Sequence, residues 1–126
     1  MATSAARRIC VMPGDGIGRE VIPWAVKALQ AATTAPFDFV EAEVGWECFQ
    51  RRGTALPEET MEILRSCDAA LFGAVSSPAH KVPGYRSPIV ALRREFGCYA
   101  NLRPVISWPI PASRQGVDLL IVRENT

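Results

Sequence analysis

Hydrophobic and polar positions along the first part of this chain predict a strand, a turn and a helix. Arg8–Met12 is a short apolar run that ends at the breaker-rich PGDGIG, and apolar residues then recur at Val21, Ala25 and Leu29. That spacing is typical of an amphipathic helix. Pro23 lies near the expected helix start, where we expect a bend or a late start of the helix.

The same alternation of element types continues further along the chain. Residues 37–44 alternate as a second strand, and WECFQRRG predicts a short helix closed by Gly53. LPEETMEILRSC predicts another helix with Pro57 at its start, and AALFGAV predicts a fully buried strand. Strands that alternate with helices indicate a largely parallel sheet, and therefore an α/β fold.

The second half of the chain opens with a long segment, residues 75–87, that is rich in Ser, Pro and Gly. Loops of this length in a compact domain are more often functional than idle. Ser87 is suited to cap the next helix, with Pro88 at its first position, and that helix is expected to run to about Phe96. A strand at YANLRPV, a link over 107–116 and a last strand at VDLLIVR follow.

Composition and charge exclude several classes of protein. The 126 residues carry 14 Lys and Arg against 13 Asp and Glu, so no basic field for a nucleic acid is present. The apolar stretches fall short of the roughly 20 residues that a membrane-spanning helix needs, and the first ten residues lack the core of a secretory signal. We therefore expect a cytoplasmic protein, with the mitochondrial matrix open if a transit peptide is missing.

The cysteine and histidine pattern predicts no metal site and no disulfide framework within this chain. The four cysteines lie far apart without a C-x-x-C pair: Cys10, Cys48, Cys67 and Cys98. We expect them to be buried, reduced thiols. His80, the only histidine, and Lys81 are interpreted as solvated loop residues.

Three arginines stand in otherwise apolar stretches. Arg103 and Arg123 are each expected to end a strand, where ligands of open α/β sheets bind, and Arg93 lies on the helix before the first of these strands. A guanidinium grips a carboxylate with two parallel hydrogen bonds, so three converging arginines suit a substrate with two or three carboxylates. Taken singly, each arginine is better explained as a side chain whose aliphatic stem lies along the apolar surface while its charged end reaches water.

Two further stretches are candidates for ligand contacts. The GDGIG turn joins a strand to a helix, so its backbone amides can approach a phosphate or a ribose, but a dinucleotide fingerprint needs glycine at Arg19. Spacing alone favours a structural turn there. Ser76 and Ser77 follow a strand, where hydroxyl groups can reach a ligand, and Asn125 stands in an expected turn after Arg123, where ordinary turn residues are the simpler interpretation.

Five motifs, in this order, carry a resemblance to a known family: GDGIGREV, LFGAVSSP, SPIVALRRE, YANLRPV and IVRENT. Over residues 8–126 the chain resembles the amino-terminal part of the decarboxylating β-hydroxyacid dehydrogenases, which include the isocitrate, isopropylmalate and homoisocitrate enzymes. The resemblance implies a two-domain α/β fold of the isopropylmalate dehydrogenase type. Residues 1–104 would form the first part of one domain and residues 105–126 the incomplete start of the second. A homodimer or larger assembly is implied for the full-length enzyme.

The resemblance also assigns roles to residues of this chain. It implies substrate contacts at Arg93, Arg103, Arg123, Ser87 and Val90, and contacts to NAD at Ile17, Ser76, Ser77 and Asn125. The catalytic lysine and the aspartate ligands of Mg²⁺ or Mn²⁺ are expected beyond Thr126, so no catalytic or metal-binding residue is assigned within this chain. We therefore expect these 126 residues alone to be inactive.

In this family, residues of the helix that begins at Ser87 largely determine which substrate is bound. An isocitrate enzyme carries Asn at the position of Ile89, where this chain is apolar. GYRSPIVALRRE most resembles homoisocitrate dehydrogenases, which implies NAD-dependent oxidative decarboxylation of the tricarboxylate homoisocitrate to 2-oxoadipate, in lysine biosynthesis by the aminoadipate route. The 3-isopropylmalate and isocitrate enzymes, a non-catalytic partner subunit and a truncated product remain open as alternatives.

Overall fold

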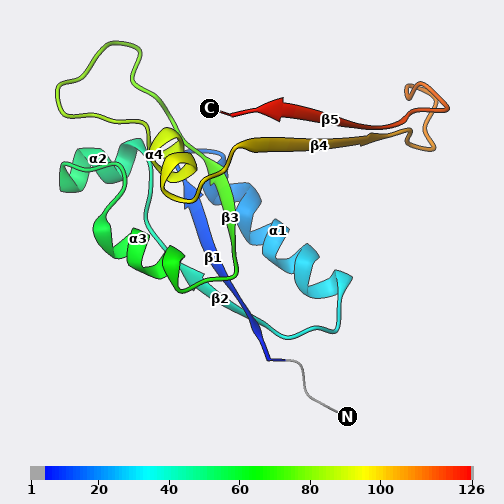
Figure 1. Cartoon of the computed structure of the whole chain (residues 1–126), viewed down its shortest axis with the longest axis horizontal. Coiled ribbons are helices and arrows are strands. Elements are labelled where there is room, and N and C mark those ends of the chain that lie inside the picture. The colour runs from blue at the N-terminus through cyan, green and yellow to red at the C-terminus, as the bar shows by residue number, and fades with distance from the viewer. Residues whose placement is uncertain (1–4, 126) are drawn as a thin grey trace. The chain divides into compact units, whose positions relative to one another are not determined.

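The computed structural model describes residues 5–125, which divide into two compact units, one up to Pro88 and one from Ile89 onward (Figure 1). In chain order the elements are β1 (Arg7–Gly14), α1 (Gly18–Ala32), β2 (Phe37–Glu41), α2 (Trp46–Arg52), α3 (Glu58–Arg65), β3 (Ala69–Ala74), α4 (Pro88–Glu95), β4 (Ala100–Ile106) and β5 (Asp118–Glu124). No helix among the described residues is both long enough and apolar enough to span a bilayer. The domain division predicted after residue 104 concerns the longer family fold and stays a prediction.

The first unit is built on three parallel strands in the order β2-β1-β3. The consecutive residues Cys10, Val11 and Met12 of the central strand β1 are all buried, so both faces of this strand are covered. Figure 1 shows α1 on one side of the strands and α3 on the other, the arrangement that two right-handed crossovers produce. The α/β architecture and the parallel sheet predicted for this part of the chain are confirmed.

Two details of the first unit differ from the sequence-based expectation. β3 is half-buried or exposed along its length, because among the described residues it pairs only with β1 and its other edge is open. The prediction of a fully buried strand there is wrong. α1 begins at Gly18, so the expected late start is also wrong, and Pro23 lies inside the helix, where it lacks the N–H that would bond to Arg19.

Two short helices connect β2 to β3, and both end or begin where the sequence predicts. α2 is closed by Gly53, which has a left-handed backbone (φ 75°) and donates its N–H to the carbonyl oxygen of Phe49 at 2.8 Å. α3 begins directly after Pro57 and buries Met61 and Leu64 in the core of the unit.

The second unit contains α4 and an antiparallel ribbon of β4 and β5. α4 starts at Pro88 as predicted, while the cap at Ser87 stays a prediction. The largely parallel sheet expected from the sequence does not extend to the last two strands, which pair antiparallel. A parallel pair needs a crossover of a dozen or more residues, whereas residues 107–116 form a tight connection in which the Ser107 hydroxyl donates to the carbonyl oxygen of Arg114 at 2.7 Å.

The ribbon has two chemically different faces. Leu102 pairs with Val122 and Pro104 with Leu120, and side chains of opposed residues share a face. This apolar face is open among the described residues, since Val122 is 62% exposed. The opposite face carries Asn101, Arg103 and Arg123 together with Ile121, and further along the apolar pair Val105 and Leu119.

Candidate functional site

The turn after β1 holds a buried carboxylate. Asp15 is 2% exposed, and its Oδ2 accepts hydrogen bonds from the backbone N–H groups of Trp46 at 2.7 Å and Ser76 at 2.8 Å. Its Oδ1 accepts a third from Glu47 at 2.9 Å. Three hydrogen bonds offset the cost of burying this charge. Asp15 thereby joins the turn to the start of α2 and to the start of the 75–87 segment.

The GDGIG turn packs closely against the end of β3. Gly14 has φ +74°, and a Cβ at this position would lie 1.9 Å from the carbonyl oxygen of Ala74, so only glycine fits. That oxygen accepts a hydrogen bond from the N–H of Asp15 at 2.7 Å. These contacts explain the glycine at position 14 without a ligand, in line with the structural turn that the spacing favours.

The far end of the 75–87 segment returns to α2 through aromatic contacts. The ring of Tyr85 lies edge-on to Trp46, with centroids 5.4 Å apart, and edge-on to Phe49, with centroids 5.3 Å apart. The Tyr85 hydroxyl donates to the carbonyl oxygen of Ser76 at 3.4 Å. The far end of the segment therefore contacts α2 directly, and its start is joined to α2 through Asp15.

The predicted cofactor residues of the first unit lie at the surface around this turn. Ile17 is 58% exposed at the start of α1, and Ser76 and Ser77 are exposed where the chain leaves β3. Asp15 brings the turn and Ser76 together. Ser87, predicted at the substrate, is half-buried at the end of the segment, and His80 is exposed, as expected of a solvated loop residue.

A pocket of about 500 Å³ lies in the second unit and contains three predicted site residues. Val90 and Arg93 reach it from α4, and Asn125 reaches it from the end of β5. The N–H of Asn125 donates to the carbonyl oxygen of Tyr99 at 3.0 Å, which holds the end of β5 against the turn after α4. The remaining lining residues are Arg94, Gly97, Cys98 and Tyr99.

Arg103 and Arg123 lie outside that pocket. The predicted position at a strand end is wrong for Arg103 and correct for Arg123, the second-last residue of β5. Arg103 is in the middle of β4, and the antiparallel pairing places the carboxyl ends of β4 and β5 at opposite ends of the ribbon. The register nevertheless pairs Arg123 with Asn101, whose Oδ1 accepts a hydrogen bond from Arg103 Nε at 3.1 Å. The two arginines therefore share one face of the ribbon with Asn101.

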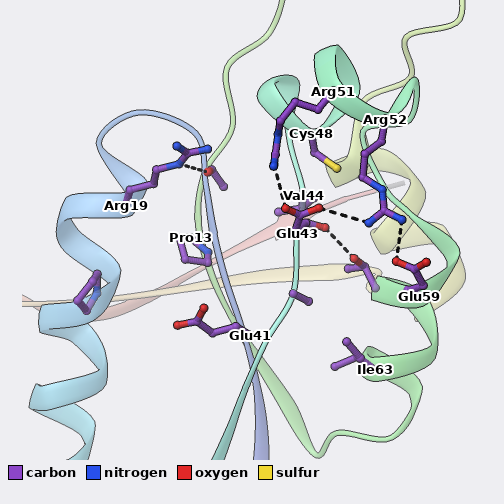
Figure 2. A pocket seen from close by; sticks show the side chains of 14 residues that line it. Pro13, Arg19, Glu41, Glu43, Val44, Cys48, Arg51, Arg52, Glu59 and Ile63 are labelled. Atoms are coloured by element: carbon purple, nitrogen blue, oxygen red, sulfur yellow. Dashed lines mark hydrogen bonds and ion pairs between the residues drawn. The ribbon is translucent and has the colours of Figure 1, made fainter.

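A second pocket, of about 550 Å³, lies in the first unit and contains none of the predicted site residues (Figure 2). Arg51 and Arg52 approach the carboxylate of Glu43 at 2.9 Å and 3.3 Å, and Arg52 also pairs with Glu59 at 2.7 Å. The hydrogen bond from Arg51 lowers the pKa of Glu43, and the hydrogen bond to Glu59 raises the pKa of Arg52. The network ties the end of α2 to the segment that follows β2 and to α3. The pocket is lined by Pro13, Gly14, Arg19, Pro23, Glu41, Ala42, Glu43, Val44, Cys48, Arg51, Arg52, Glu59, Thr60 and Ile63.

The four cysteines are free thiols in different environments. Cys10 and Cys48 are buried as predicted, whereas Cys67 is half-buried and Cys98 is exposed, so the expectation is wrong for these two. Cys98 is exposed because it follows α4 in a turn at the rim of the second-unit pocket. Burial raises the pKa of Cys10 to about 11 and also raises that of Cys48. Among residues 5–125 no group of three His, Cys, Asp or Glu side chains is placed to hold a metal ion.

Sequence reasoning missed three residues of the first unit: Asp15, Trp46 and Tyr85. An acidic residue between two glycines at a strand-to-helix turn is a usable signal, because such a side chain either faces water or accepts nearby backbone N–H groups. Gly45, directly before Trp46, is a second signal. A Cβ at this position would lie 2.5 Å from Asp15 Oδ2, so glycine leaves room for the carboxylate.

Comparison with known proteins decides the family. Residues 8–126 match the family model described as isocitrate/isopropylmalate dehydrogenase. The chain belongs to this family. It is 60% identical over 121 residues to the isocitrate/homoisocitrate dehydrogenase of Thermus thermophilus, a match that covers 96% of this chain and 36% of that protein. It is 48% identical over 120 residues to the 3-isopropylmalate/3-methylmalate dehydrogenase of Methanocaldococcus jannaschii, covering 94% of this chain and 34% of that protein.

Solved structures of family members share the fold of this part. A β-decarboxylating dehydrogenase from Thermococcus kodakarensis matches with a TM-score of 0.80 and 46% identity, over 95% of this chain and 34% of its own. Isocitrate dehydrogenase from Methylococcus capsulatus matches with a TM-score of 0.84 and 33% identity, over 95% of this chain and 35% of its own. The resemblance inferred from the five motifs is confirmed, and the chain spans about a third of the length of these relatives.

Proposed function

We propose that this chain is part of an NAD-dependent dehydrogenase that oxidatively decarboxylates homoisocitrate to 2-oxoadipate. The observation that carries the proposal is the second-unit pocket, which combines the Arg93 guanidinium, the apolar Val90 and the Asn125 amide. Two relatives are named for this substrate: the Thermus thermophilus protein, and a homoisocitrate dehydrogenase of Methanocaldococcus jannaschii that is 40% identical over 131 residues.

The pocket chemistry suits a small acid with several carboxylates. Arg93 can hold one carboxylate with two parallel hydrogen bonds. Val90 offers an apolar contact to a carbon chain instead of a donor to another acid group, which favours a substrate whose next carboxylate lies further away. Arg103 and Arg123 share one face of the ribbon and are our candidates for the remaining carboxylates.

The NAD contacts are proposed at Ile17, Ser76, Ser77 and Asn125. The exposed Ile17 side chain suits an aromatic base, and exposed serine hydroxyls suit the polar groups of a nicotinamide nucleotide. When bound, NAD would supply the hydride acceptor for the secondary alcohol, and a divalent metal such as Mg²⁺ or Mn²⁺ would supply positive charge that favours decarboxylation. The described residues do not gather a ligand set for that metal. The full-length enzyme is proposed to work as a homodimer or larger assembly.

A chimera tests the proposal, because the chain spans about a third of its relatives. Residues 8–125 replace the matching segment of the Thermus thermophilus enzyme, and NAD reduction is measured with homoisocitrate, 3-isopropylmalate and isocitrate. We expect the highest kcat/KM with homoisocitrate. A preference for 3-isopropylmalate would instead support the second candidate, for which the apolar pair Ile89 and Val90 is the favouring observation. A folded chimera without activity on any of the three acids refutes the proposed function.

Val90 provides the sharpest test of substrate choice. In the chimera, Val90→Arg should raise kcat/KM for isocitrate relative to homoisocitrate, because the new guanidinium can meet the carboxylate on the shorter arm of isocitrate. Ala91→Arg is the matched control, since Ala91 is an exposed neighbour on α4 that does not line the pocket. Equal effects of the two substitutions would contradict the assignment of Val90.

A further inference from the structure

The segment 75–87 contains no helix or strand, yet it carries two residues that the proposed function assigns to the cofactor. Ser76 and Ser77 stand at its start, exposed to solvent. Ordering an irregular segment costs conformational entropy, so serines on such a segment bind a ligand well only if other contacts hold their backbone in place. The structure shows which contacts do this.

The backbone of Ser76 is held from two directions. Its N–H donates to the buried Oδ2 of Asp15 at 2.8 Å, and its carbonyl oxygen accepts a hydrogen bond from the Tyr85 hydroxyl at 3.4 Å. The N–H of Asp15 in turn donates to the carbonyl oxygen of Ala74 at 2.7 Å. Two consecutive peptide units at the exit of β3 are therefore fixed to the GDGIG turn.

Both anchors of Ser76 depend on α2. Asp15 accepts two of its three hydrogen bonds from the N–H groups of Trp46 and Glu47 in the first turn of α2. Tyr85 is placed by its edge-on contacts with Trp46 and Phe49 of the same helix. Charge pairs with Glu43 and Glu59 hold the far end of α2, so the helix itself is anchored.

We propose that α2 acts as a clamp, through Asp15 and Tyr85, that sets the position of Ser76 and Ser77 for cofactor binding. Tyr85 is then a positioning residue, because it acts through Ser76 and does not itself contact the ligand. The identity of the ligand, NAD, rests on the proposed function. The clamp itself rests only on the hydrogen bonds of Asp15 and Tyr85 and on the ring contacts of Tyr85 with α2.

Three substitutions separate the clamp from general stability. Tyr85→Leu removes both ring contacts and the hydroxyl, Tyr85→Phe restores the ring, and Phe37→Leu removes a ring contact (centroid distance 5.6 Å to Phe39) elsewhere in the same unit. Amide hydrogen exchange of residues 75–87 is measured in the protein. KM and kcat for NAD are measured in the chimera described above.

Two lost edge-on ring contacts should raise the exchange rates of Ser76 and Ser77 about tenfold in Tyr85→Leu. The KM for NAD should rise by about the same factor, with kcat within about twofold. Tyr85→Phe should give smaller increases of both, because the ring contacts with α2 remain while the hydrogen bond to Ser76 is lost, and Phe37→Leu should lower the midpoint of unfolding without changing either.

Each alternative outcome has a defined meaning. Unchanged exchange at Ser76 and Ser77 in Tyr85→Leu overturns the clamp. Faster exchange with an unchanged KM for NAD overturns the role in cofactor binding. If the chimera with wild-type residues does not use NAD, the proposed function fails, while faster local exchange in Tyr85→Leu still supports the clamp.

Discussion

The buried carboxylate of Asp15 makes a quantitative prediction about stability. In Asp15→Asn one oxygen remains, and at the Oδ2 position it can still accept from Trp46 and Ser76, although as a neutral acceptor. The side-chain NH2 group then faces the N–H of Glu47, and no hydrogen bond forms because both groups are donors. One hydrogen bond lost in a buried site and two weakened ones should lower the free energy of unfolding by about 2–4 kcal/mol.

Urea denaturation followed by tryptophan fluorescence measures this change. Trp24 and Trp108 are 68% and 65% exposed, so Trp24→Phe and Trp108→Phe leave Trp46, beside Asp15, as the reporter at little structural cost. With a slope near 2 kcal/mol per M, the midpoint should fall by about 1–2 M. Asp118→Asn is the matched control, because Asp118 is exposed at the start of β5, and its midpoint should shift by less than about 0.3 M.

If Asp15→Asn shifts the midpoint no more than Asp118→Asn does, with an unchanged slope, the three hydrogen bonds do not contribute net stability. A changed slope instead indicates that the substitution altered the exposed surface of one of the two states, and the comparison then moves to hydrogen exchange at Trp46 and Ser76.

Three further predictions concern other parts of the molecule. Gly14→Ala should cost more than about 3 kcal/mol in a thermal melt, because its Cβ would meet the oxygen of Ala74, whereas Gly16→Ala, with φ +49° and open space, should cost about 1–2 kcal/mol. The pKa of Glu43 is lowered by Arg51, so its ion pair should stabilise the fold above the ordinary glutamate pKa of 4.5 and be lost as pH falls below it; Glu43→Gln should flatten this part of the stability profile. An anionic thiol reagent followed by mass spectrometry should label Cys98 first and Cys10 last, and simultaneous labelling of both would contradict the burial of Cys10.

The fold of the first unit was predictable because its local signals agree with its tertiary structure. Apolar runs, glycine and proline positions and helix periodicity all predict the same strands and helices, and alternating elements are compatible with few topologies. The exposure of β3 was not predictable from AALFGAV. An apolar run shows that a strand can be buried, but it does not show how many neighbours cover it, and β3 has only one neighbouring strand among the described residues.

The error in the second unit came from one rule applied too widely. Placing Arg103 and Arg123 at one shared carboxyl edge assumed a parallel sheet, but the connection over 107–116 is a tight link without a helix, so the strands pair as a hairpin. Reading the length of the link before the chemistry of the arginines would have put both on one face of a ribbon. The role of both arginines in substrate binding stays a prediction, and only their placement on one face is shown.

Asp15 shows why the site itself was harder to predict than the fold. Its hydrogen-bond partners Trp46 and Ser76 stand 31 and 61 residues further along the chain, so no local pattern reveals them. The choice between a structural turn and a cofactor loop was also too narrow for GDGIG. In the proposed clamp, the turn serves the cofactor by holding Ser76 through Asp15, and Gly14 and Gly18 are needed for packing against β3. Asp15 can then be essential for cofactor binding, through Ser76, without contacting the cofactor itself.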